Sequence, residues 1–168
     1  MRVAYADPPY IGQARKHYGE NAAEVNHSLL IAHLCEFDAW ALSCSSPSLR
    51  EILPLCPAGV RVGAWVKPFC SFKPNVNPAY AWEPVIFSGG RKRSRKETTR
   101  RDWVQECILL KKGVHGAKPL AFCWWVFEFL NLLPGDTLYD LFPGSGAVTR
   151  AWENWQQYKS GAQEVLAL

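Results

Sequence analysis

The stretch that decides the fold opens the chain and reads Val3-Ala4-Tyr5-Ala6-Asp7-Pro8-Pro9-Tyr10. Its apolar half, residues 3–6, is typical of a short strand buried on both faces of a parallel sheet. The paired prolines can continue neither a strand ladder nor a helix, so they predict a rigid loop at the carboxyl end of this strand. In open α/β sheets, ligands bind at that end of the strands.

The loop Asp7-Pro8-Pro9-Tyr10 carries a carboxylate, exposed carbonyls and an aromatic ring. These groups suit a planar amine such as N6 of adenine or N4 of cytosine, because the Asp7 carboxylate and the Pro8 carbonyl can accept its N–H protons. Tyr10 can stack on the face of the base. The same residues also fit a proline-rich turn in which Asp7 is a turn residue and Tyr10 packs locally.

A second signal lies near the other end of the chain, in Asp136-Thr137-Leu138-Tyr139-Asp140-Leu141-Phe142-Pro143-Gly144-Ser145-Gly146. An apolar strand here runs into a glycine-rich turn, and residues 147–158 have a helical pattern. Gly144 and Gly146 let the backbone approach a ligand closely, and the free amides at the start of the helix suit a nucleoside cofactor. An ordinary strand-to-helix turn also fits these residues.

Together the two motifs resemble the DNA amino-methyltransferases, which transfer methyl groups from S-adenosyl-L-methionine to exocyclic amines of DNA bases. The motif order resembles the permuted, beta-class arrangement, because Asp7-Pro8-Pro9-Tyr10 comes first and the glycine turn comes last. Lys118-Pro119 resembles the motif that precedes the cofactor strand, and residues 82–87 resemble a late-strand signature. The resemblance implies an α/β, Rossmann-like methyltransferase sheet with circularly permuted motif order, mostly parallel with an antiparallel edge and truncated at one side.

The resemblance also assigns site residues. The catalytic residues it implies are Asp7, Pro8, Pro9 and Tyr10. The cofactor-binding residues it implies are Ala6, Asp7, Lys118, Pro119, Asp140, Phe142, Gly144, Ser145 and Gly146. The resemblance implies adenine N6 rather than cytosine N4 as the preferred substrate amine, because Asp rather than Ser opens the first motif. It implies no metal.

Composition bounds the class of protein. The 168 residues suit a single domain, 1–168, and no apolar run reaches the length of a membrane span. The six cysteines are widely spaced without a Cys-x-x-Cys pair, and the histidines are not clustered, so we expect no metal site and a cytoplasmic protein with reduced thiols. The net charge of +4 permits an anionic partner.

Basic residues gather in the loop 89–101, where Glu97 is the only acid. We expect this loop to be extended and to contact the phosphates of double-stranded DNA, although it also fits a solubilising loop. The predicted nucleic-acid-binding residues are Arg91, Lys92, Arg93, Arg95, Lys96, Arg100 and Arg101. Two further loops mix aromatic and basic residues that suit contact with bases and phosphates, although solvated charges and locally packed rings also fit them. They carry Lys67, Phe69, Phe72 and Lys73 in one loop and Arg15, Lys16, His17 and Tyr18 in the other.

The remaining elements follow from periodicity and from turn residues. We expect helices at residues 27–35, 48–55 and 119–133, and strands at residues 38–45, 60–66, 80–88 and 105–110. Beyond the cofactor helix, the family normally has a strand ending in an acid that holds the ribose, then an edge strand. Residues 164–168 form a candidate strand whose acid lies at the wrong end, so we expect weak cofactor binding, or a homodimer or partner chain that completes the edge.

The leading hypothesis from the sequence is therefore methyl transfer from S-adenosyl-L-methionine to an exocyclic amine of DNA. Two alternatives remain open. One is a catalytically degenerate nucleic-acid-binding or regulatory subunit, because the ribose acid is missing. The other keeps the chemistry and changes the substrate to RNA or to a protein side-chain amide.

Overall fold

The computed structural model describes residues 1–12, 23–69, 74–109 and 117–161. The expectations for Arg15, Lys16, His17, Tyr18, Phe72, Lys73 and residues 164–168 lie outside these ranges.

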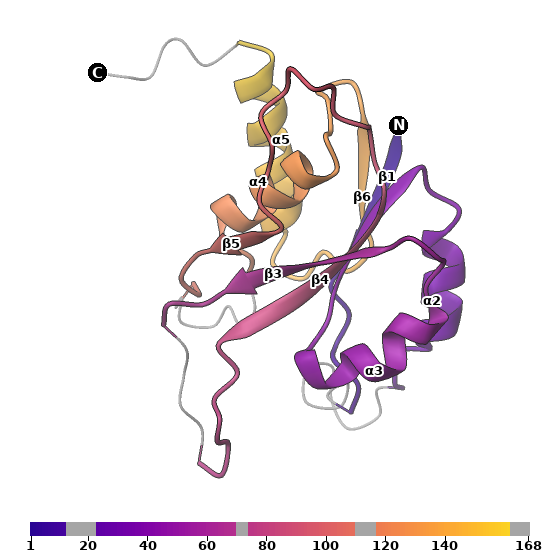
Figure 1. Ribbon diagram of the computed structural model, residues 1–168, viewed down its shortest axis with the longest axis vertical. Coiled ribbons are helices and arrows are strands. Elements are labelled where there is room, and N and C mark those ends of the chain that lie inside the picture. The colour runs from indigo at the N-terminus through magenta and orange to yellow at the C-terminus, as the bar shows by residue number, and fades with distance from the viewer. Residues whose placement is uncertain (13–22, 70–73, 110–116, 162–168) are drawn as a thin grey trace.

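Six strands form one sheet in the described part of the chain, in the order β5-β3-β4-β2-β1-β6 (Figure 1). The strands are β1 (Arg2–Ala6), β2 (Ala39–Ser43), β3 (Arg61–Val66), β4 (Trp82–Gly89), β5 (Trp103–Gln105) and β6 (Thr137–Asp140). β1 pairs in parallel with β2 and β6, β3 pairs in parallel with β5, and β4 runs antiparallel to both of its neighbours. The mostly parallel α/β sheet predicted from the sequence is confirmed, and its antiparallel strand lies between β2 and β3.

Helices cover both faces of this sheet (Figure 1). α2 (His27–Leu34) and α3 (Leu49–Ile52) lie on one face, and α4 (Leu120–Phe129) and α5 (Ala147–Lys159) lie on the other. Short 3-10 turns at Ser46–Ser48 and Leu53–Leu55 flank α3.

β1 is central to the core because its side chains pack alternately on the two faces of the sheet. Ala4 and Ala6 pack with the buried side chains of α2, whereas Val3 and Tyr5 pack with those of α4 and α5. Successive side chains of a strand point to opposite faces, so a strand covered on both sides has an unbroken apolar sequence. This burial fixes the place where the Asp7 loop leaves the sheet.

The two helices behind the sheet differ in their burial. α5 buries Val148, Ala151, Trp152 and Trp155, which is the spacing of an amphipathic helix on a core. α4 ends at Phe129, earlier than the predicted residue 133, because Asn131 adopts a left-handed φ of 54°. The backbone N–H of Leu132 then donates to the Phe127 carbonyl at 3.0 Å and closes the helix.

The strand predicted at residues 105–110 is wrong in position, since β5 spans Trp103–Gln105. Ala64 N–H donates to the Asp102 carbonyl at 2.9 Å, and the Trp65 indole N–H donates to the Glu106 carbonyl at 2.8 Å. These bonds to β3 hold residues 102–106 against the sheet, and no local sequence pattern encodes them. No helix in the described ranges is both long and apolar enough to cross a membrane.

Candidate active site

The two motifs predicted to act together lie side by side at one end of the sheet. In the parallel register of β1 and β6, Tyr5 pairs with Asp140, and Leu141 N–H donates to the Tyr5 carbonyl at 2.9 Å. The loop that begins at Asp7 and the turn that begins at Phe142 therefore leave adjacent strands at the same carboxyl edge. Residues more than a hundred positions apart in sequence are thus brought to one place, which is where ligands bind in such sheets.

An alternating chain of charges runs away from Asp7 into the core. The Lys118 ammonium lies 3.0 Å from Asp7 Oδ1 and 2.5 Å from Glu83 Oε1. The Lys67 ammonium donates to the other Glu83 oxygen at 2.9 Å. Lys118 and Glu83 are 6% and 5% exposed, whereas the Asp7 side chain is 23% exposed, so Asp7 is the carboxylate of this chain that is open to a ligand.

Burial and the neighbouring charges set the protonation of this chain. Burial raises the pKa of Asp7 to about 6, with Lys118 opposing the rise and Glu83 adding to it. Burial also disfavours ionised Glu83, but Lys118 and Lys67 outweigh this effect and lower the pKa of Glu83 to about 2. Burial alone would lower the pKa of Lys118, but Asp7 and Glu83 raise it above its usual range. Near neutral pH the chain therefore alternates carboxylate and ammonium.

The rest of the first motif is held firmly. Pro8 and Pro9 are buried, while Tyr10 is half-buried beside the charge chain. Burial, followed by the carboxylates of Glu83 and Asp7, raises the pKa of Tyr10 well above its usual value. The Tyr10 phenol stays neutral, so it offers a ring face and a hydroxyl rather than a charge.

The glycine turn has the geometry that was predicted for it. Gly144 and Gly146 have φ values of 45° and 71°, and Gly146 N–H donates to the Pro143 carbonyl at 2.6 Å. A Cβ atom at Gly144 would meet only the Phe142 carbonyl, at 3.9 Å, so the space in front of this residue is open. Gly146 precedes α5 with no side-chain cap, which leaves the first amides of the helix available.

Asp140 lies between the turn and the Asp7 loop. Its Oδ2 atom accepts a hydrogen bond from Thr149 at 3.3 Å, while its buried Oδ1 atom has no hydrogen-bond partner in the described structure. Burial raises the pKa of Asp140, and hydrogen bonding from the Thr149 hydroxyl and the Phe142 backbone opposes this rise. A buried acceptor without a partner is the feature expected where a ligand supplies the missing donor.

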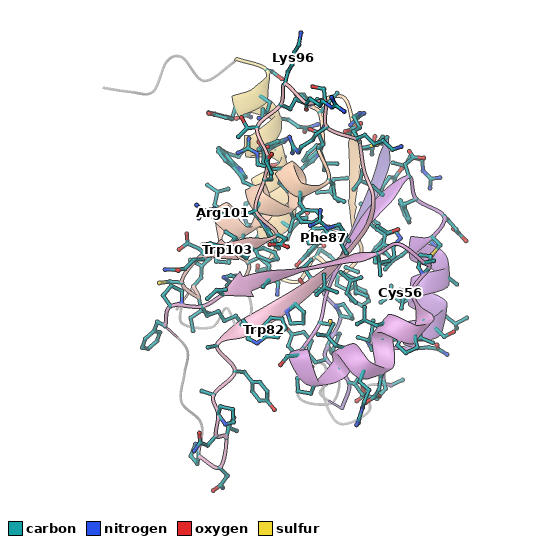
Figure 2. The ribbon with its side chains drawn as sticks, in the orientation of Figure 1. Cys56, Trp82, Phe87, Lys96, Arg101 and Trp103 are labelled. Carbon is teal, nitrogen blue, oxygen red and sulfur yellow. The ribbon has the colours of Figure 1, made fainter. Side chains whose placement is uncertain are left out.

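The basic loop lies at the other end of the sheet. It begins where Gly89 pairs with Ala39, the first residue of β2, whereas the Asp7 loop follows the last residue of β1. Figure 2 shows Lys96 at the top of the view and Trp82, at the catalytic end of β4, well below it. The structure therefore separates residues 89–101 from the catalytic loop.

Several predicted nucleic-acid-binding residues are engaged within the protein. Arg91 makes two hydrogen bonds to Asp136, at 2.5 and 2.6 Å. Arg93 and Arg100 pair with Glu128, and the Arg101 guanidinium lies 5.0 Å from the Trp103 ring centroid. The exposed basic side chains of this loop for which the structure shows neither an ion pair nor a ring contact are Lys92, Arg95 and Lys96.

Two members of the charge chain, Glu83 and Lys67, were not predicted as site residues. The signal for Glu83 was present in the sequence, because it is the only acid in the otherwise apolar stretch 82–89. A lone acid on a buried strand requires a partner, but the sequence does not say which. Among the described residues, no group of His, Cys, Asp and Glu side chains is arranged to hold a metal ion.

Comparisons with known proteins give a fold and no family. No family model and no curated protein sequence matches the chain. A solved structure of M1.HpyAVI in complex with SAM matches with a TM-score of 0.61 and 18% identity, over 92% of this chain and 78% of that chain. A structure of M1.HpyAVI alone matches with a TM-score of 0.58 and 18% identity, over 92% of this chain and 76% of that chain. The chain therefore shares the α/β fold of M1.HpyAVI.

Proposed function

We propose that this chain transfers a methyl group from S-adenosyl-L-methionine to an exocyclic amine of DNA, with adenine N6 as the preferred target. The proposal rests on one observation: the Asp7 loop and the open glycine turn leave adjacent strands, β1 and β6, at the same carboxyl edge of the sheet. The fold shared with M1.HpyAVI, whose solved structure is a complex with SAM, supports it.

The chemistry follows from the Asp7 loop. An exocyclic amine is a poor nucleophile because its lone pair is delocalised into the ring. The Asp7 carboxylate and the Pro8 carbonyl accept its N–H protons, which draws the nitrogen towards tetrahedral geometry and stabilises the positive charge that develops. Asp7 then holds the proton that the nitrogen releases. Tyr10 stacks on the face of a base turned out of the helix.

The residues at the glycine turn fit the proposed cofactor, which supplies an electrophilic methyl group on a sulfonium. The open space at Gly144 admits a ligand against the backbone, and the buried Asp140 Oδ1 can accept a hydrogen bond from an amine or hydroxyl of that ligand. The helix amides after Gly146 add further donors. The resemblance implied cofactor binding for Lys118. Its ammonium also contacts Asp7 directly, so Lys118 acts on the catalytic carboxylate.

The position of the site suggests where DNA lies. The loop that follows β3 leaves the sheet at the same end as Asp7, and it exposes Phe69 (54%) and Tyr80 (57%). These rings suit stacking on bases near the reacting one. Lys92, Arg95 and Lys96 suit phosphates farther along the duplex, since they lie beyond the opposite end of the sheet.

The degenerate-subunit alternative rests on β6. No strand follows β6 in the described part of the chain, so the acid expected to hold the ribose is not among the described strands. Within the described ranges no strand pairs with the outer edge of β6, so a second copy of the chain could pair there, which sedimentation at increasing concentration would detect.

Transfer of a labelled methyl group separates these alternatives. The chain is incubated with labelled S-adenosyl-L-methionine and with unmethylated DNA, RNA or protein, and the DNA is then digested to nucleosides. The proposal predicts label in DNA as N6-methyladenine. Label in RNA alone or in protein alone would assign that molecule as the substrate instead of DNA. No label in any acceptor would favour the catalytically degenerate subunit.

A further inference from the structure

Glu83 is a buried acid whose two carboxylate oxygens are both engaged. It lies on β4 with its Oε1 atom 2.5 Å from the Lys118 ammonium and its Oε2 atom 2.9 Å from the Lys67 ammonium. Removing one partner from a buried ion pair is costly because the other charge is left without compensation. The position of Lys118 therefore depends on Glu83.

Lys118 is fixed on its other sides as well. Pro119 follows it and begins α4, and the Lys118 ammonium lies 5.3 Å from the Trp65 ring centroid and 5.6 Å from that of Phe122. The ion pair between this ammonium and Asp7 is to the Oδ1 oxygen, at 3.0 Å. No described residue donates a hydrogen bond to Asp7 Oδ2, so this oxygen can accept one from a ligand.

We propose that Glu83 is a positioning residue that holds Lys118 against one oxygen of Asp7, leaves the second oxygen to accept the substrate amine, and keeps the Asp7 carboxylate basic by its own negative charge. The inference rests on the proposed function, in which Asp7 accepts the protons of the amine. Glu83 itself touches no substrate. It acts through Lys118 and through its charge.

The effect of the Glu83 charge on the pKa of Asp7 can be separated from the effects of the other titratable groups near Asp7. The titratable groups that influence Asp7, or are influenced by it, are Tyr5, Tyr10, Cys44, Glu83, Lys118, Cys123 and Asp140. Burial raises the pKa of both thiols to about 12 and raises the pKa of both phenols well above its usual value, so these four groups stay neutral near pH 7. The charges that remain belong to Lys118, Glu83 and Asp140.

The sign of each change follows from these charges. Glu83→Gln removes a negative charge, so Lys118 acts on Asp7 with less opposition and the pKa of Asp7 falls below about 6. Lys67→Gln leaves Glu83 less neutralised, so the pKa of Asp7 rises. A purely structural role for Glu83 would lower activity without moving the pH profile.

The test is the pH dependence of single-turnover methyl transfer to DNA, at saturating S-adenosyl-L-methionine, between pH 4.5 and about 9. In the wild type, we expect the rate to fall on the acid side with a midpoint near pH 6, which is the acid limb of the profile. For Glu83→Gln the acid limb lies at lower pH, and the maximal rate is reduced about tenfold or more. For Lys67→Gln the acid limb lies at higher pH. Glu128→Gln is the matched control. Its carboxylate is 18% exposed and pairs with Arg93 and Arg100 of the basic loop and with Lys159 of α5, so its loss leaves the limb in place.

Carboxyl carbon NMR of Asp7 in the isolated chain measures the same pKa without any turnover. If the wild type transfers no methyl group, the proposed function fails, and the NMR shifts of Glu83→Gln and Lys67→Gln still decide the role of Glu83. If Glu83→Gln does not fold, as judged by circular dichroism, Lys67→Gln decides it. An Asp7 pKa that is unchanged in both variants, or that moves in the same direction in both, overturns the proposal.

Discussion

Asp7→Ala should slow methyl transfer by about two orders of magnitude or more while leaving the affinity for S-adenosyl-L-methionine nearly intact. Asp7 is the more exposed of the two carboxylates in the charge chain, and one of its oxygens is already taken by Lys118 at 3.0 Å. The remaining oxygen is a charge-assisted acceptor for the amine, and it is needed most in the transition state. Deleting one such group from a preorganised site costs about 3 to 4 kcal/mol, or roughly a hundredfold to a thousandfold in rate.

The assay is single-turnover transfer of labelled methyl to unmethylated DNA, with cofactor affinity measured separately by calorimetry. Asp102→Ala is the matched control, because Asp102 is an exposed aspartate whose ion pair with Arg61 lies away from β1. We expect the control to transfer methyl at the wild-type rate. Equal rates for Asp7→Ala and wild type would refute the assigned mechanism, and a parallel loss of cofactor binding would assign Asp7 to the cofactor instead.

The same carboxylate sets a pH dependence. Because burial raises the pKa of Asp7 to about 6, its ionised form increases as the pH rises through this value, and activity should rise with it and level off above about pH 7. A rate that is flat from pH 5 to about 8 would mean that Asp7 does not act as the ionised acceptor.

Three further predictions address the glycine turn and the two loops proposed to contact DNA. Gly144→Val should weaken cofactor binding about tenfold or more, because the side chain fills the open space at the turn. Gly59→Val is the control, since Gly59 also has a positive φ and open space around it, and it should leave binding unchanged. Equal calorimetric affinities for both variants would contradict the placement of the cofactor at Gly144. Replacing Lys92, Arg95 and Lys96 by alanine should flatten the dependence of DNA affinity on salt, and an unchanged slope would remove this loop from the phosphates. Tyr80→Ala should weaken binding of single-stranded DNA by about 1 to 3 kcal/mol in fluorescence titrations, and an unchanged affinity would mean that Tyr80 does not stack.

Local signals explain why much of the site could be predicted from the sequence. Apolar residues before Asp7 and Asp140, followed by proline or glycine, mark strands that end in a loop, and their parallel order brings the loops together. A proline before an apolar run likewise marked the start of α4.

The ion pairs could not be predicted, because each joins segments that are distant in sequence. Lys118 and Glu83 are 35 residues apart, and neither position carries a local sign of its partner. The basic loop illustrates the same point. Its density of charge predicted contact with phosphates, yet Arg91 is held by Asp136 and Arg100 by Glu128. Charge counts in a segment omit the acids that the fold brings to it.

Calorimetric titration of the wild-type chain with S-adenosyl-L-methionine tests the central claim most directly, because the proposed function requires this cofactor at the Phe142 turn. We expect saturable binding of a single molecule per chain. Titrations at two temperatures guard against an enthalpy that happens to be near zero at one of them, since burial of apolar surface changes the heat capacity. Saturable heat at either temperature supports a methyltransferase, and the absence of binding at both would contradict the account.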